Sequence, residues 1–495
     1  MSSENHLLIA VDLGAESGRV VVGRLCDGRL SFEEVHRFAT GAQAREGSLR
    51  WDLAAIENEI EQGLTLAARH QREGETASVG VDSWGVDYVL MREGQPLSSW
   101  PFHYRDARTQ AVFERVRSQA QSEIFAATGL QFLPFNTLYQ LLAQREQTPQ
   151  EWHQSDGFLL IADYFSWVLS GVARSESSLA STTQLFDPLQ GKWSDELLHH
   201  FDLPASRFAP VVASGTVLGP LSPEFGARTG LRNTEVVATC AHDTAAAVAA
   251  VPAQSGEDWA FLSSGTWSLL GIELPAPLIN AEVLRAGFTN EAGFGGTTRF
   301  LKNIVGLWIV QECRRFWDSK GQSFSYGELS SMAENAAPLR ALIRPDDPRF
   351  SAPNEMPRKI ADFCRETGQR APETPGEFVR CVSESLAMSY RQTLERAEEL
   401  TGRRVARLHL VGGGSQNDLL NRLTADATGR EVWAGPVEAT ALGNLGVQAL
   451  ALGHLDDLDV LRRIVRDTCK PRVFTPGNAR EWHEAASRFQ TLKPS

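Results

Sequence analysis

A hairpin pattern that occurs twice in the chain restricts the fold more than any other feature. An apolar run from Leu7 reaches Asp12, passes through a small polar turn at residues 15–18 and returns as the apolar run 19–25. About 250 residues later, residues 259–274 repeat the order of strand, Ser-Ser-Gly-Thr turn and strand. Two such similar hairpins rarely arise by chance, so we expect an internal duplication and not a solenoid array.

The rest of the chain alternates strands with helices, which is typical of the α/β class. Its 495 residues are enough for two large domains. The apolar spacing predicts helices at 53–71, 110–128, 138–146, 306–317, 376–401 and 416–428. A strand is expected at 78–91, and residues 201–231, rich in Pro, Gly and Ser, read as an irregular connection. We place the two domains at 1–248 and 249–495.

Composition excludes several classes of protein. The 48 basic and 61 acidic residues give a net charge of −13, which repels nucleic acid and anionic lipid, so neither partner is expected. No apolar run approaches the roughly 18 residues that would span a bilayer, and the start of the chain lacks a basic leader. Six scattered cysteines form no C-x-x-C pair, so no zinc site is predicted and a cytoplasmic location is expected.

The two hairpin tips are candidate phosphate sites. In the first, small residues allow backbone N–H groups to approach an anion, and Asp12 stands at the strand end where it can hold a cation. In the second, the hydroxyls of Ser263, Ser264 and Thr266 can donate hydrogen bonds to phosphate oxygens. The alternative for each is a tight turn in which glycine only permits positive φ.

Three further clusters have candidate roles. Gly412–Gly413–Gly414 after an apolar strand admits a flat ligand such as adenosine, or only a close crossover; no G-x-G-x-x-G or P-loop spacing occurs. Asp243 opens a helix near the domain boundary, either as a general base for a hydroxyl or as an ordinary first-turn acid. Trp84, among the polar residues 82–87, suits a sugar face or simple core packing.

Together these segments resemble the FGGY carbohydrate kinases over nearly the whole chain. The stretches that carry the resemblance are VDLGAESGRV, GVDSWGVDYVL, FHYRDART, TGLQFLPFNTLYQL, AHDTAAAV, LSSGTWSLLG, LKNIVGLWIVQ, HLVGGGSQN and AGPVEATALGNLGVQ. The resemblance implies an actin-like ATPase fold, in which two ribonuclease-H-like domains surround a central cleft. It also implies ATP-dependent phosphorylation of the ketose L-rhamnulose at O1, in rhamnose catabolism.

The resemblance assigns roles to matching positions of this chain. It places Asp243 as the catalytic base and Asp12 as an acid that helps to hold Mg²⁺ through water. The ATP-binding positions that it implies are Ala15, Glu16, Ser17, Gly18, Arg19, Thr266, Gln311 and Gly413. The sugar-binding positions are Gly85, His242, Asp243, Thr244 and Asn303. Cys364 and Cys381 match a pair found in the family, which we expect to stay reduced in a cytoplasm.

Two rival functions remain open from the sequence. One is a kinase of the same family that acts on fuculose, xylulose or glycerol. The other is an actin-like nucleotide switch, which would bind ATP without phosphorylating a small molecule. Asp243 and the sugar-type cluster from Trp84 to Asp87 favour a kinase. A monomer or weak dimer is expected.

Overall fold

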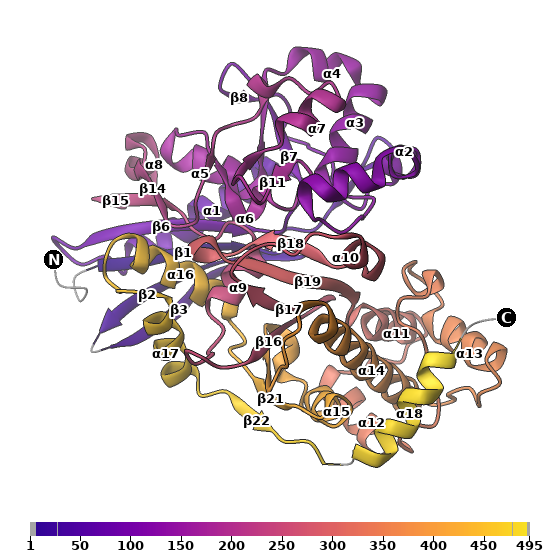
Figure 1. Ribbon diagram of the computed structural model, residues 1–495. Helices are drawn as coiled ribbons and strands as arrows, with labels where there is room; N and C mark the ends of the chain where they lie inside the picture. Colours follow the sequence, from indigo (N-terminus) through magenta and orange to yellow (C-terminus); the bar gives the residue numbers. More distant parts are fainter. Residues whose placement is uncertain (1–5, 27, 478, 493–495) are drawn as a thin grey trace. The chain divides into compact units, whose positions relative to one another are not determined.

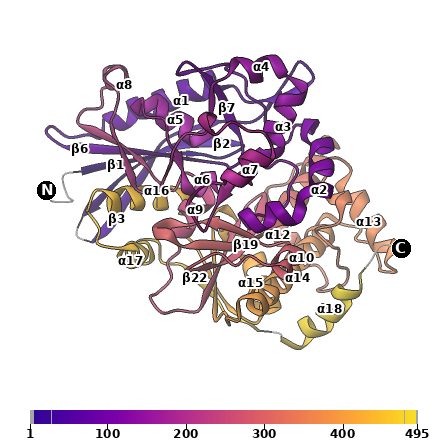
Figure 2. The same ribbon diagram turned by 45° about the horizontal axis from the view of Figure 1, so that its top comes forward.

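The computed structural model describes residues 6–26, 28–477 and 479–492, and its chain divides into two compact units (Figures 1 and 2). Unit 1 comprises Met1–Val251, Glu273–Phe300 and Ala439–Thr468. Unit 2 comprises Pro252–Ile272, Leu301–Glu438 and Cys469–Ser495. Each unit therefore takes in segments that are distant in sequence, and the boundary at 248 and 249 stays a prediction.

Unit 1 is built on a six-stranded sheet in the order β14-β15-β6-β1-β2-β3. The strands are β1 (His6–Leu13), β2 (Ser17–Cys26), β3 (Arg29–Ala39), β6 (Thr76–Ser83), β14 (Thr216–Pro220) and β15 (Thr234–Ala238). Strand β1 pairs antiparallel with β2 and parallel with β6, which in turn pairs parallel with β15. This places the carboxyl ends of β1, β6 and β15 at one edge of the sheet.

Helices cover both faces of this sheet. They are α1 (Leu53–Ala68) and α5 (Ile161–Ser170) on one face and α16 (Ala439–Ala451) on the other (Figures 1 and 2). Helix α9 (Asp243–Ala249) packs against α16. Because β1 is covered on both sides, all its residues are buried, which explains why its sequence is a nearly continuous apolar run.

The remaining elements of unit 1 are short strands and helices inserted between the sheet strands. They are β4 (Gln43–Arg45), β5 (Ser48–Arg50), β7 (Tyr88–Arg92), β8 (Gln95–Pro96), α2 (Gln110–Thr128), α3 (Thr137–Gln147), α4 (Pro149–Gln154), β9 (Gly157–Leu160), β10 (Ser175–Glu176), α6 (Ser177–Ala180), β11 (Phe186–Asp187), β12 (Lys192–Trp193), α7 (Asp195–His200), β13 (Val211–Val212), α8 (Pro223–Thr229), α10 (Ala281–Ala286) and β18 (Thr289–Ala292). Helix α17 (Leu458–Cys469) ends the last segment of the unit.

Unit 2 repeats the same strand order. The chain's seven-stranded sheet runs β18-β19-β17-β16-β20-β21-β22, and β16 pairs antiparallel with β17 and parallel with β20. The further strands are β16 (Trp259–Ser264), β17 (Trp267–Leu274), β19 (Thr298–Val305), β20 (Arg407–Val411), β21 (Glu431–Ala434) and β22 (Arg472–Phe474). The order β3-β2-β1-β6-β15-β14 thus corresponds to β19-β17-β16-β20-β21-β22, which confirms the predicted duplication.

The helices of unit 2 follow the same pattern of strand and crossover. They are α11 (Trp308–Ser319), α12 (Tyr326–Glu334), α13 (Met356–Glu366), α14 (Pro375–Thr401), α15 (Asp418–Thr428) and α18 (Ala479–Thr491). Helix α14 begins with a capping box in which Thr374 and Glu377 each bond the other's backbone N–H. It packs against α12 and α15.

Most predicted helices are confirmed, with two corrections elsewhere. The strand expected at 78–91 is two strands, β6 and β7, because the chain turns between Trp84 and Asp87 with Val86 at φ 71°. The connection at 201–231 contains β13, β14 and α8, whose short runs carry too little apolar periodicity to be recognised. Among the described residues, no helix is both long and apolar enough to cross a membrane.

Candidate active site

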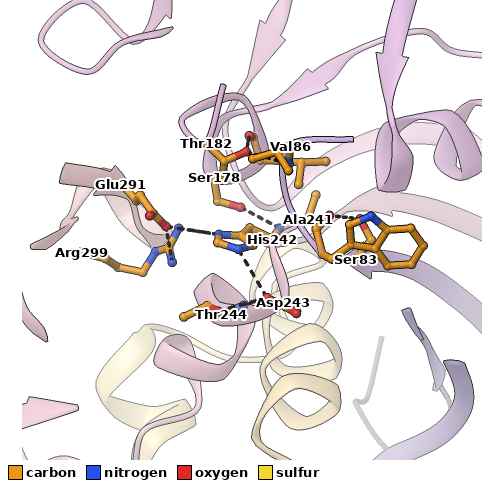
Figure 3. Close-up of polar contacts among 12 residues, drawn as sticks. Ser83, Val86, Ser178, Thr182, Ala241, His242, Asp243, Thr244, Glu291 and Arg299 are labelled. Atoms are coloured by element: carbon orange, nitrogen blue, oxygen red, sulfur yellow. Dashed lines mark hydrogen bonds and ion pairs between the residues drawn. The ribbon is translucent and has the colours of Figure 1, made fainter. Parts of the chain in front are cut away.

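The polar residues that follow β15 lie next to those that end β6. The amide of Ser83 donates to the carbonyl oxygen of Ala241 at 2.9 Å, and Ser83 forms a parallel bridge with His242. This proximity follows from the parallel pairing of β6 with β15, since parallel strands end at the same sheet edge. Helix α9 begins at the next residue, Asp243, so the sheet edge positions the predicted base (Figure 3).

Asp243 is held through one of its two carboxylate oxygens. Its Oδ1 accepts from the backbone N–H of Thr244 at 2.5 Å and from the Thr244 hydroxyl at 3.0 Å. The side chain keeps 34% of its surface accessible. Burial raises the pKa of Asp243, the neighbouring His242 opposes that rise, and the nearby Asp12 carboxylate adds to it. A raised pKa makes the carboxylate a better proton acceptor than an ordinary surface aspartate.

His242 stands between Asp243 and a buried ion pair (Figure 3). Its Nε2 lies 3.4 Å from Oδ1 of Asp243, and its Nδ1 lies 3.1 Å from Nη2 of Arg299. The Glu291 carboxylate is 3.1 Å from the Arg299 guanidinium. On the backbone side, the His242 amide donates to Oγ of Ser178 at 3.1 Å.

A buried glutamate anchors that loop. Glu176 Oε2 accepts from the Ser178 hydroxyl at 2.6 Å and from the Ala241 amide at 3.1 Å. The same oxygen caps α6 by accepting from the amide of Leu179. Glu176 therefore ties α6 to the chain that leads into Asp243.

Three carboxylates of unit 1 interact at the ends of its strands. Asp12 and Asp82 are partners in the register of β1 and β6, and Asp12 pairs with Arg19 at 2.6 Å. Asp82 accepts from Asn444 at 2.5 Å, whereas its buried Oδ1 has no hydrogen-bond partner. Burial, reinforced by the charges of Asp12 and Asp243, raises the pKa of Asp82 well above its usual range.

This group of carboxyl groups offers oxygen ligands to a cation held through water. In the described part of the chain, no three His, Cys, Asp or Glu side chains are arranged to bind a metal directly. Mg²⁺ commonly keeps several waters and binds one or two carboxylates together with substrate phosphates, so a direct three-ligand cage is not required. Asp12, at the end of β1, would contact such an ion through its bound waters.

The first hairpin tip, between β1 and β2, is a defined turn. The Gly14 amide donates to the carbonyl of Ser17 at 3.0 Å, and the Thr40 hydroxyl donates to the carbonyl of Gly14 at 2.5 Å. Glu16 and Ser17 are exposed at the apex, and a Cβ on Gly18 would collide with the Phe38 ring at 2.5 Å. Of the predicted ATP positions 15–19, Ala15 and Glu16 form the turn and Ser17 to Arg19 begin β2. Glu16 and Ser17 are accessible, while Gly18 is buried and required by packing.

The turn at Gly85 is held by hydrogen bonds of Val86 to two threonine side chains, and Trp84 beside it is buried. Val86 holds positive φ because its amide donates to Thr182 Oγ1 and its carbonyl accepts from Thr137 Oγ1. The Trp84 indole is 5% exposed and stacks on Trp51 at 4.0 Å. Both indole N–H groups donate to Asp87, and burial raises the pKa of Asp87 to about 6. Core packing, the alternative role of Trp84, is the one that the structure shows.

In unit 2 the remaining predicted ATP residues gather around the β16–β17 tip. Gln311 Nε2 donates to the Thr266 hydroxyl at 3.3 Å, while its buried Oε1 has no hydrogen-bond partner. Gly412 has φ 82° and packs near the backbone of Ser264, whereas Gly413 is exposed with no atom within 4 Å of a Cβ. Asn303, predicted to bind sugar, is half-buried on β19.

Local sequence patterns did not predict the charged residues that support the site. Glu176, Glu291 and Arg299 stand singly in short segments, with no motif around them. The only indication in the sequence is that these charged residues lie within or beside apolar strand patterns. Since buried charges are rare unless they are paired, such positions indicate a buried ion pair. The six cysteines are free thiols, and a hydrogen bond between Cys364 and Cys381 lowers the pKa of Cys364.

The duplicated sheets and their hairpin tips define a two-domain actin-like ATPase fold. A solved structure of xylulose kinase from Rhodospirillum rubrum superposes with a TM-score of 0.79, covers 98% of each chain and is 18% identical, which supports the fold alone. Models of the N-terminal and C-terminal domains of the FGGY family of carbohydrate kinases match residues 7–250 and 260–452. The chain belongs to the FGGY family of carbohydrate kinases.

Curated relatives match almost the whole chain. The rhamnulokinase of Bacteroides thetaiotaomicron is 41% identical over 485 residues, which cover 97% of this chain and 98% of that protein. The rhamnulokinase of Pectobacterium carotovorum is 41% identical over 494 residues, covering 98% and 96%. The similarity therefore extends through both units.

Proposed function

We propose that this chain transfers the γ-phosphate of ATP to O1 of L-rhamnulose, giving L-rhamnulose 1-phosphate in rhamnose catabolism. The observation that supports this type of reaction concerns Asp243. It is a partly accessible carboxylate with a raised pKa, and one of its oxygens has no hydrogen bond. The choice of sugar is supported by curated rhamnulokinases that are 41% identical over nearly the whole chain.

In the proposed reaction, the O1–H bond breaks and its proton passes to Asp243. O1 attacks the γ-phosphorus in line, the new O–P bond forms, and the bond to the bridging oxygen breaks to release ADP. A positioned base contributes about 10²- to 10⁴-fold to such a step. Because the protein does little covalent chemistry in phosphoryl transfer, positioning of the two substrates supplies most of the remainder.

The nucleotide is assigned to two sets of residues. One set is residues 15–19 at the first hairpin tip, and the other is Thr266, Gln311 and Gly413 around the second tip. The unpaired Oε1 of Gln311 is an acceptor for a nucleotide N–H or O–H group. Asp12 would hold Mg²⁺ through water, and the ion when bound would neutralise charge on the phosphates.

The sugar is assigned to Gly85, His242, Thr244 and Asn303 together with Asp243. Polar groups that pair with the hydroxyls of the correct sugar are left unpaired by a sugar with a misplaced hydroxyl. Such a site can discriminate by up to about 10⁴-fold. The C6 methyl group contributes less, since one methyl contact is worth about 1–3 kcal/mol.

We also propose a cytoplasmic location and a monomer or weak dimer. In a reducing compartment Cys364 and Cys381 would remain thiols. Neither nucleic acid nor a membrane is proposed as a partner, because the net charge of −13 disfavours binding to anionic surfaces.

A coupled assay of ADP release tests this function with Mg-ATP and equal concentrations of L-rhamnulose, L-fuculose, D-xylulose and glycerol. We expect kcat/KM for L-rhamnulose to exceed the others by at least about a hundredfold. An equal or higher value for any other sugar would reject the proposed substrate and leave the family assignment in place. ADP release with no sugar dependence would favour the nucleotide switch instead.

A further inference from the structure

An ion pair buried beside His242 has no place in the function described so far. Arg299 is 0% exposed and Glu291 is 5% exposed. Their side chains lie 3.1 Å apart, and the Arg299 Nε also donates to the carbonyl oxygen of Ala292 at 3.1 Å. Figure 3 shows the pair on the side of the His242 ring away from Asp243. Burial of two charges is costly, so their retention beside a substrate-binding histidine suggests a specific task.

The hydrogen-bonding roles around the ring can be worked out from the donor inventory. A guanidinium has five N–H donors and no acceptor, so Nδ1 of His242, 3.1 Å from Arg299 Nη2, must accept. Glu291 Oε2 is 3.4 Å from the same nitrogen and would compete for an Nδ1 proton. The Arg299 contact is shorter and has hydrogen-bond geometry. Glu291 Oε2 lies 3.1 Å from Arg299 Nη1 as an ion pair but forms no hydrogen bond, either to Arg299 or to the ring.

A ring whose Nδ1 accepts carries its proton on Nε2. That nitrogen faces Oδ1 of Asp243 at 3.4 Å, so the contact becomes an attraction between N–H and carboxylate. In the other neutral tautomer, a bare Nε2 lone pair would face the carboxylate oxygen and push Asp243 away. In the imidazolium form, Nδ1–H would point at the Arg299 guanidinium, and two positive groups would meet in a buried space.

We infer that Arg299, held in place by Glu291, is a positioning residue for phosphoryl transfer, because it fixes His242 as the Nε2–H tautomer that orients Asp243. This inference rests on the proposed role of Asp243 as the base. The described hydrogen bonds of Asp243 both end on Oδ1, and the His242 N–H would be a third group directed at that oxygen. Oδ2 is thereby kept for the sugar proton.

Glu291 neutralises the charge of the buried Arg299. Burial alone would raise its pKa, yet the neighbouring Arg299 charge opposes that effect, and the pKa of Glu291 lies below its usual range. The pair is therefore internally neutralised. Arg299 can act on the ring as a directed donor without adding a net positive charge beside Asp243.

The tautomer can be read directly from the protein. Long-range ¹H–¹⁵N correlation spectra of the full chain, with ¹⁵N-labelled histidine rings, distinguish a protonated ring nitrogen from a bare one. The His242 signals are assigned by their loss in a His242→Gln variant. We expect the Nε2–H pattern at pH 7.5. An Nδ1–H or imidazolium pattern in the parent protein would overturn the inference whether or not the enzyme phosphorylates L-rhamnulose.

Variants then test whether the tautomer matters for turnover. The double change Arg299→Met with Glu291→Leu removes both charges at similar volume. We expect kcat to fall at least about tenfold with the KM for ATP within about twofold, and the Nε2–H pattern to be lost. Arg299→Lys keeps one donor and should recover part of kcat. A folded double variant that keeps the parent's tautomer and kcat would reject the role of Arg299.

A second ion pair of unit 1 provides the matched control. Arg24 and Glu75 are joined by bonds of 2.9 and 3.0 Å, and the Glu75 side chain is 0% exposed. The double change Arg24→Met with Glu75→Leu should change Tm but leave kcat and the His242 spectrum as in the parent protein. If the Arg299 double variant does not fold, Glu291→Gln replaces it, and an unchanged kcat and tautomer there would count against the inference. An inactive parent enzyme with the Nε2–H pattern would instead count against the proposed function.

Discussion

The hairpins β1–β2 and β16–β17 occupy equivalent places in their sheets and carry opposite chemistry at their tips. Each begins with a strand that pairs antiparallel with the next strand and parallel with a later one. Strand β1 ends near Asp12, beside Asp82 on β6. Strand β16 ends at Ser264 next to Gly265 and Thr266, and β20 beside it leads into glycines. One region collects carboxylates, and the other collects hydroxyls and glycine.

The difference shows that sheet topology and site chemistry are specified by different residues. Apolar strand interiors determine the pairing, which is the same in both units, whereas the last residue of each strand determines the charge at the sheet edge. Carboxylates suit proton acceptance and a hydrated cation, and neutral donors suit phosphate oxygens. We therefore expect changes in the first region to lower turnover and changes in the second to weaken nucleotide binding.

The largest effect is expected from Asp243→Asn. The amide keeps an oxygen that can accept from Thr244 but cannot take the sugar proton, so kcat should fall at least about a hundredfold. Nucleotide binding, followed by calorimetry with ADP, should stay within about twofold of the parent. Turnover within tenfold of the parent, with normal ADP binding, would show that the carboxylate is not the base. It would also contradict the expectation that changes in the first region lower turnover.

The stability of the first hairpin should depend on pH through His6. Burial lowers the pKa of His6 to about 4, while the ring bonds to the Thr76 and Ser78 hydroxyls. Between pH 6.5 and about 4 the unfolded chain binds a proton that the folded chain excludes, so stability is present above pH 6.5 and is lost as pH falls. That loss is about 3 kcal/mol.

Denaturant titrations at pH 7 and pH 5 compare the parent with His6→Gln. The variant should lose less stability over this interval than the parent. Strand β16, which corresponds to β1, carries no ionisable side chain and so has no counterpart of His6. An identical pH dependence in both proteins would mean that His6 does not distinguish the two hairpins.

A smaller effect is expected from Gly414→Ala in unit 2. A Cβ there would lie 2.1 Å from Oγ and 2.5 Å from Cβ of Ser264, so β16 and the glycine loop must move apart. Overpacking of this kind costs about 1–3 kcal/mol, which differential scanning calorimetry would register as a lower Tm. An unchanged Tm would show that the two loops pack less closely than the structure indicates.

The smallest effect on the folded chain is expected from the neighbouring change Gly413→Ala. No atom lies within 4 Å of the added Cβ, and φ is not positive, so Tm should match the parent. If ATP lies against this loop, the methyl group should raise the KM for ATP several-fold and leave the KM for the sugar nearly unchanged. Equal changes in both constants would contradict the assignment of Gly413 to the nucleotide. They would also contradict the expectation that changes in the second region weaken nucleotide binding.

Local patterns were sufficient to predict much of the fold. The apolar runs of both hairpins, the helix at 110–128 and the long helix at 376–401 correspond to β1–β2, β16–β17, α2 and α14 (Pro375–Thr401). Each depends on a period of 2 or 3.6 that is visible within one segment. The break between β6 and β7 was not predictable, because Val86 takes a left-handed conformation that β-branched residues rarely adopt, supported by Thr182 from far along the chain.

The candidate site also combines residues that the local sequence indicates with contacts that only the folded chain forms. The amino-acid sequence alone singled out Asp12, Asp243 and the two tips as candidates, because a strand that ends in a polar residue at a turn can be recognised locally. It could not connect Asn444 on α16 with Asp82, or Arg299 with His242, since these bonds join residues far apart in the chain. The charge state and orientation of a buried group depend on all its neighbours in space, so the chemistry around Asp243 is set by residues that folding brings together.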